Sequence, residues 1–150
     1  MHNFDFDVIQ QCKEMVAKEE NKANGGMKKP DVPYGTYEVK IDKLAFGYTQ
    51  ANNPKMEVHF KIVNGQFENC KIYMHQSLHK AFGYYKAIKL LKSLESNVYV
   101  DFVEEYPEFE QMLFDIKKDI DGKKEYKLEF KPNDKNSDFN EYNIIKVYDL

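Results

Sequence analysis

The sequence predicts an α+β protein that is mainly β. The expected fold is a five-stranded OB-like barrel with the order β-β-β-α-β-β, an N-terminal helix and an extra helix before strand four. Three observations predict it: three alternating apolar-polar segments follow one another, a helical segment comes next, and two more alternating segments close the chain. With 42% hydrophobic and 15% aromatic residues, the 150-residue chain can bury a core.

The N-terminal part is predicted to be a helical appendage, residues 1–26, joined by a linker, residues 27–33. Apolar residues recur at helical spacing over 7–22, and Asn24-Gly25-Gly26 supplies a stop. Prolines in the linker disfavour both helix and sheet pairing. The apolar stripe of the helix needs a cover, either its own barrel or a second chain.

The main domain, residues 34–150, opens with predicted strands over 35–46, 56–62 and 67–76, with Asn64-Gly65 as a two-residue hairpin signal. A helix is expected over about 77–95, although Gly83 weakens its first turn. The remaining predicted elements are an extended piece at 98–102, a helix that starts at Pro107, a turn at Asp121-Gly122, a strand through Tyr126, Leu128 and Phe130, a polar loop at 131–138 and a strand at 140–148.

Charge is distributed unevenly along the chain, whose net charge is −3. Residues 69–94 hold five lysines and no acidic residue, whereas residues 95–121 hold nine acidic residues and two lysines. Both blocks are open to two interpretations, ordinary solvated faces or binding surfaces. Every basic residue is lysine, which neutralises phosphates but reads base edges less well than arginine.

Catalytic and metal-binding motifs are not evident. No serine lies in a nucleophile-elbow context, no glycine-rich phosphate loop appears, and Cys12 and Cys70 are too far apart to indicate a metal site. His75 and His79 are four residues apart but straddle a predicted strand-helix junction without a third ligand nearby. We therefore expect a non-enzyme without cofactor or metal. The absence of a membrane-length apolar run and of a signal peptide predicts a cytoplasmic protein.

A binding surface is predicted opposite the apolar faces of strands two and three. Lysines and flat rings alternate there, and binding of unpaired strands needs both, for phosphates and for unstacked bases. The same residues also suit the outer face of any half-exposed sheet. Flanking loops and the central helix extend the predicted surface. The candidate nucleic-acid-binding residues are Tyr48, Lys55, His59, Lys61, Lys71, Tyr73, His75, Lys86, Lys89, Lys131 and Lys135.

The central helix is unusual on its polar side, where Phe82 and Tyr85 lie among lysines. Three explanations stay open: this face receives the N-terminal helix, contacts another subunit in a homo-oligomer, or extends the nucleic-acid surface.

The run from Val32 to Ile41, VPYGTYEVKI, resembles the P-x-G-T-Y-x-V-x-I opening of a phage-encoded single-stranded-DNA-binding family long catalogued as a domain of unknown function. Similarity at the level of pattern continues over residues 32–148. The resemblance implies an OB-like fold and a role in phage replication or recombination, in the cytoplasm of an infected or lysogenic bacterial host. The acidic segment 95–121 departs from the family pattern.

These observations predict a non-catalytic, sequence-tolerant protein whose partner is single-stranded DNA and whose further partners are replication or recombination proteins. The alternative is a phage-type inhibitor or interaction module, in which the acidic segment 95–121 imitates a nucleic-acid backbone and binds a host nuclease.

Overall fold

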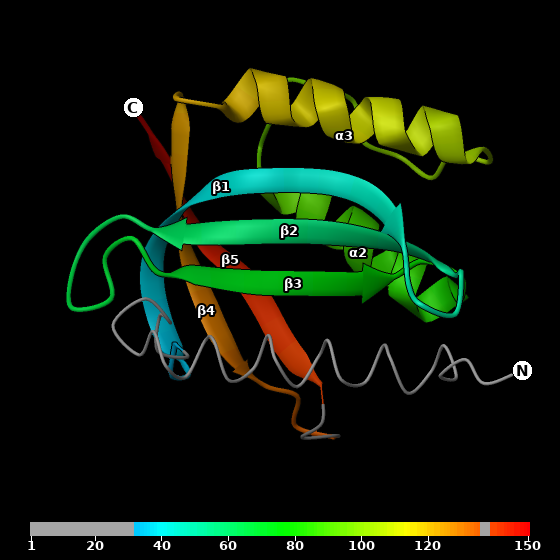
Figure 1. The fold of residues 1–150 in the computed structure, drawn as a ribbon. Coiled ribbons are helices and arrows are strands. Elements are labelled where there is room, and N and C mark those ends of the chain that lie inside the picture. The colour runs from blue at the N-terminus through cyan, green and yellow to red at the C-terminus, as the bar shows by residue number, and fades with distance from the viewer. Residues whose placement is uncertain (1–31, 136–138) are drawn as a thin grey trace, which may run out of the picture. The chain divides into compact units, whose positions relative to one another are not determined.

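A computed structural model describes residues 32–135 and 139–150, which form a mainly β unit of five strands and two helices (Figure 1). The chain divides into two units, Met1–Asp31 and Val32–Leu150. The predicted N-terminal helix and the linker up to residue 31 lie outside the described residues. The elements are β1 (Gly35–Tyr48), β2 (Pro54–Ile62), β3 (Lys71–Ser77), α2 (Ala81–Ser93), α3 (Tyr106–Ile120), β4 (Lys124–Pro132) and β5 (Asn140–Asp149).

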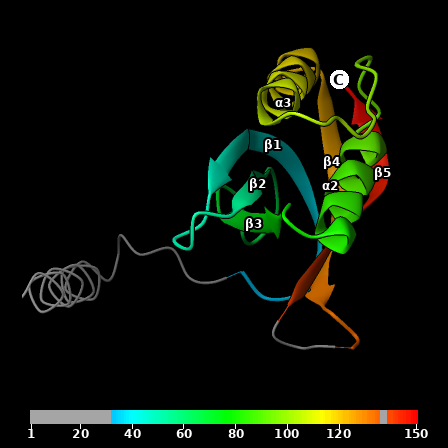
Figure 2. The ribbon, with the colours of Figure 1, turned by 90° about the vertical axis from the view of Figure 1, so that its right-hand side faces the viewer.

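The strands form one antiparallel sheet in the order β3-β2-β1-β4-β5. Strand β1 serves both halves of this sheet, because its residues up to Val39 pair with β4 and those from Val39 onward pair with β2. A register shift between Ile41 and Lys43 marks a bulge, which bends a strand. The sheet is strongly curved as a result (Figure 2). Its strand order is compatible with the predicted OB-like fold.

The barrel, however, is not closed, and this part of the prediction is wrong. Strands β3 and β5 are the two edges of the sheet and share no ladder. A side chain bridges them instead, since the Tyr142 hydroxyl of β5 donates a hydrogen bond of 3.0 Å to the Tyr73 carbonyl of β3. Helix α2 contacts both edge strands. Because a whole tyrosine side chain spans the space between them, the two backbones lie further apart than the roughly 4.8 Å that backbone pairing requires.

The connection between β2 and β3 also differs from the prediction. Asn64-Gly65 does not form a two-residue hairpin, and β3 begins at Lys71 rather than Phe67. The Phe67 ring instead packs edge-on against Tyr37 with centroids 6.1 Å apart, and both side chains are partly buried against the core. The loop closes through a 2.8 Å hydrogen bond from the Asn69 amide to the Ile62 carbonyl.

Both predicted helices of the main domain are present, with shifted bounds. Helix α2 starts at Ala81 rather than Ser77, and a Cβ at Gly83 would lie 2.2 Å from the Ser77 carbonyl oxygen. Glycine therefore permits the close approach of this helix to the end of β3. Helix α3 has Pro107 in its first turn, as predicted. Residues 98–102, predicted to be extended, have irregular structure and form no strand.

The core lies between the concave side of the sheet and the two helices. Helix α3 lies along β1, and α2 lies behind the face formed by β2 and β3 (Figure 1). Buried Phe60, Leu91 and Ile116 show how sheet and helices share this core. The Tyr126 hydroxyl, buried at its centre, donates a 2.9 Å hydrogen bond to the Leu94 carbonyl, and burial raises its pKa well above the ordinary value. Neither described helix is both long and apolar enough to span a bilayer.

Candidate nucleic-acid interface

The predicted residues of strands two and three lie together on the solvent side of the sheet. Strand β2 alternates strictly between buried and partly exposed positions, and β3 alternates in the same way over its first five residues. We call this side the sheet face. Its charged and aromatic members are Lys40, Asp42, Lys43, Lys55, Glu57, His59, Lys61, Lys71, Tyr73 and His75.

A ring pair occupies the middle of the sheet face. His59 and Tyr73 are direct cross-strand neighbours, and their rings meet edge to face with centroids 4.6 Å apart. Tyr73 is 53% exposed, whereas the His59 side chain is 15% exposed. The more buried His59 ring therefore packs against the inner side of Tyr73, and Tyr73 presents a flat ring to solvent.

His59 is held in place from its other side. Its Nε2 lies 2.7 Å from Glu57 Oε1, and the second carboxylate oxygen lies 3.6 Å from Lys43 Nζ. The hydrogen bond from His59, with the nearby lysines, lowers the pKa of Glu57 despite the opposing effect of burial. A charged carboxylate at this position orients the imidazole that supports Tyr73.

A second lysine-histidine contact lies along the same strands. Lys55 Nζ is 3.0 Å from His75 Nδ1, so the ammonium donates to the ring nitrogen. Burial, and next the charge of Lys55, lower the pKa of His75. The imidazole is therefore neutral at pH 7, and the positive charge of the pair resides on Lys55.

Lysines surround these rings and make the sheet face positive. Lys71 forms a 2.8 Å ion pair with Asp42, a contact that raises the pKa of Lys71 and lowers that of Asp42. Lys61 makes no ion pair with any residue that the structure describes. Over Lys40–Tyr48, β2 and β3 there are five lysines and two carboxylates, an excess of three positive charges.

Two lysines of this face, Lys40 and Lys43, were not among the predicted site residues. The signal for Lys40 was present, because it alternates with buried Val39 and Ile41. Lys43 breaks the alternation, since the bulge that follows Ile41 brings it opposite His59. Only knowledge of that bulge places Lys43 on the sheet face.

Other predicted residues lie elsewhere. Tyr48 packs edge-on against Phe46 at 5.3 Å and lies 6.5 Å from Tyr106, at the start of α3. Lys131 lies between Glu129 and Glu141, at 3.8 and 3.6 Å, which offset its charge. Lys135 is exposed in the loop between β4 and β5. The structure does not bring these residues together with Tyr73.

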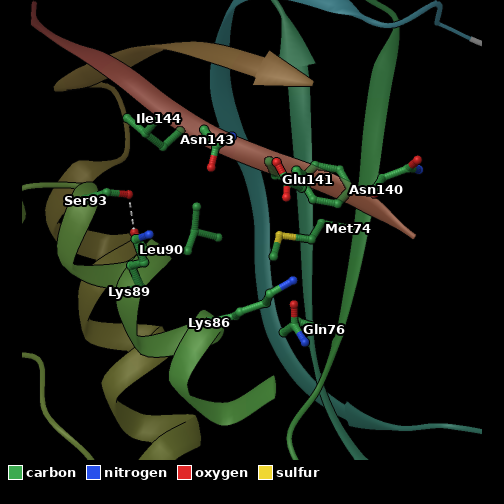
Figure 3. A pocket seen from close by; sticks show the side chains of 11 residues that line it. Met74, Gln76, Lys86, Lys89, Leu90, Ser93, Asn140, Glu141, Asn143 and Ile144 are labelled. Atoms are coloured by element: carbon green, nitrogen blue, oxygen red, sulfur yellow. Dashed lines mark hydrogen bonds between the residues drawn. The ribbon is translucent and has the colours of Figure 1, made fainter. Parts of the chain in front are cut away.

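Lys86 and Lys89 form a separate group on α2. They line a groove of about 300 Å³ between α2 and the two edge strands of the sheet (Figure 3). Its walls include Met74 and Gln76 from β3 and residues 140–144 from β5. Strand β3 thus contributes to both surfaces, with Tyr73 on the sheet face and Met74 in the groove.

His75 and His79, four residues apart, have separate hydrogen-bond partners. His75 is bound by Lys55, whereas His79 Nδ1 lies 2.5 Å from the Ser77 hydroxyl. Within residues 32–135 and 139–150, no three His, Cys, Asp or Glu side chains gather in a way that suits a metal ion.

Comparison with known proteins adds no relationship to this geometry. No family model matches the chain, and no curated protein is significantly similar to it.

Proposed function

We propose that the protein is a non-catalytic, sequence-tolerant single-stranded-DNA-binding protein that uses the sheet face. The observation that carries the proposal is the half-exposed Tyr73 ring, supported by His59 and surrounded by lysines. An aromatic ring accepts an unstacked base at roughly 1–3 kcal/mol, and lysines neutralise phosphates with release of counterions. An OB-like domain uses the equivalent strands to hold oligonucleotides.

The chemistry of the face favours single strands without sequence preference. Lysine is a mobile point charge, and no arginine is present to read base edges in bidentate fashion. A duplex keeps its bases stacked and paired, so it offers Tyr73 no free base. Small residues lie next to the charged residues of β2 on this face, because β1 places Ala45 opposite Glu57 and Gly47 opposite Lys55.

The opening motif supports a more specific role in phage replication or recombination. Its tyrosines have structural positions here: the Tyr37 hydroxyl donates a 2.6 Å hydrogen bond to the Pro33 carbonyl, and Tyr34 lies 4.9 Å from the Phe130 ring. The Tyr34–Phe130 contact joins the start of β1 to β4, and the Tyr37 hydrogen bond stays within the motif itself.

Fluorescence anisotropy with labelled oligo-dT and a matched duplex tests the proposal. We expect binding to oligo-dT, weak binding to the duplex, and an affinity that falls linearly as log salt rises, with about 0.7 of slope for each phosphate-contacting lysine. Oligo-dT affinity that is absent, or indifferent to salt, would refute this function.

A second candidate, an inhibitor of a basic host protein such as a nuclease, follows from the acidic segment. Glu104, Glu105, Glu108 and Glu110, around the start of α3, are all exposed and form no ion pair within the described part of the chain. A row of carboxylates can imitate phosphates. An inhibitor would bind a candidate nuclease and ignore the oligonucleotide, so the two functions give opposite results in one pair of titrations.

A further inference from the structure

The outward side of α2 has an unusual composition for an exposed helix face. Phe82 is 69% exposed and Tyr85 is 54% exposed, at positions where a surface helix ordinarily has polar side chains. We call this side the α2 face, and its members are Phe82, Tyr85, Lys86, Lys89 and Lys92.

The charge of the α2 face is not neutralised within the described unit. Its three lysines form no ion pair with residues 32–135 or 139–150, and the helix contains no acidic residue. Lys86 Nζ instead lies 4.7 Å from the centre of the Phe82 ring. Cations interleaved with exposed rings are the combination that binds a phosphate backbone and its unstacked bases.

The α2 face and the sheet face lie on the two sides of the edge strand β3. Lys86 and Lys89 line the groove whose other wall includes Met74 and Gln76 (Figure 3). Tyr73 lies on the opposite side of the same strand, as the alternating burial of β3 shows. The groove contains one carboxylate, Glu141, and it is engaged by Lys131 at 3.6 Å and by the Asn133 amide at 3.0 Å. A polyanion that leaves the sheet face over β3 therefore meets Lys86 and Lys89 next.

We infer that the α2 face is a second contact segment for the same single strand, with Phe82 and Tyr85 as base platforms and Lys86 and Lys89 as phosphate contacts. The inference rests on the proposed function of the sheet face and extends it. It implies a length threshold: a short oligonucleotide occupies the sheet face alone, and a longer one gains affinity when it also reaches α2.

The test is a length series of oligo-dT, from about 4 to about 16 nucleotides, titrated against three proteins. These are the wild type, Phe82→Ala, and the double variant Lys86→Gln/Lys89→Gln. The matched controls are Phe114→Ala, which removes a similarly exposed phenylalanine (61%) from α3, and Lys118→Gln, which neutralises an exposed lysine there. Circular dichroism and sedimentation velocity monitor folding and oligomeric state.

We expect wild-type affinity to rise in a second step as the oligonucleotide lengthens. Phe82→Ala should weaken binding of the longest oligonucleotide about 5- to 150-fold and leave the shortest unchanged. The double variant should lose about 0.7 of salt slope per lysine, again only for long oligonucleotides.

Three results would overturn the inference and leave the proposed function of the sheet face unaffected. They are equal affinities of variants and wild type at every length, equal losses at every length, and a changed oligomeric state with unchanged affinity. The last would identify the α2 face as a contact between copies of the chain. If the wild type binds no oligonucleotide of any length, the proposed function fails instead.

Discussion

Replacement of Tyr73 by alanine is the most direct perturbation of the sheet face. The ring is half exposed, its centroid lies 4.6 Å from that of the His59 ring, and its hydroxyl makes no hydrogen bond with the residues that the structure describes. The backbone carbonyl of the same residue accepts the hydrogen bond from Tyr142, and this bond survives any change of side chain. The substitution therefore removes the exposed ring and little else.

Two free energies follow from this geometry. Loss of one base-stacking contact costs about 1–3 kcal/mol of binding, which is about a 5- to 150-fold rise in Kd. Loss of the ring pair with His59 costs about 0.5–1.5 kcal/mol of folding stability. A domain of this size has roughly 5–15 kcal/mol of stability, so Tyr73→Ala remains folded while its affinity falls.

Anisotropy titrations with oligo-dT measure the change, and urea unfolding confirms that the variant is folded. Tyr73→Phe keeps the ring and should keep most of the affinity, which separates stacking from any role of the hydroxyl. Tyr99→Ala is the control, because Tyr99 is 83% exposed but lies in the acidic segment. If Tyr73→Ala binds oligo-dT as tightly as the wild type does, Tyr73 is not part of the site. The exposed ring would then be no guide to where bases bind.

Three further predictions concern stability and are measured by urea unfolding. Burial lowers the pKa of His75 from its usual 6.5, so near this pH the unfolded chain binds more protons than the folded one. The free energy of unfolding of the wild type should therefore fall as pH drops from about 7.5 to about 5.5, and His75→Gln should flatten that dependence. Gly83→Ala places a Cβ 2.2 Å from the carbonyl that ends β3 and should destabilise by about 1–3 kcal/mol, whereas Gly47→Ala, at 3.7 Å from its nearest neighbour, should change stability little. Tyr142→Phe deletes the bridge to the Tyr73 carbonyl and should cost about 0.5–1.5 kcal/mol; an unchanged stability would show that the edges are held without it.

Elements whose evidence is local in the sequence were predictable. The alternation of Met56, Val58, Phe60 and Ile62 fixes both the existence and the inward face of β2, because side chains of a strand alternate sides. Pro107 correctly marked the first turn of α3. The hairpin prediction at Asn64-Gly65 failed because Phe67 packs against Tyr37, a partner far away in the sequence, and lies outside the ladder.

The candidate site likewise has a part that the sequence could predict and a part that depends on tertiary packing. His59 and Tyr73 could be assigned to one face because adjacent antiparallel strands with the same alternation present their polar sides together. The separation of Lys86 from that face depends on where α2 packs, and the sequence pattern of a helix does not specify this. The open edge between β3 and β5 likewise depends on a tertiary contact, the reach of Tyr142.

The shared strand β1 has a consequence for how tightly a ligand is held. One continuous backbone joins the two halves of the sheet, and its bulge after Ile41 fixes the angle between them. The spacing of the backbone positions that carry the lysines is consequently set when the chain folds, before any ligand arrives. Because little of the backbone has to become ordered during association, the entropic cost of binding falls mainly on the lysine side chains and on the ligand.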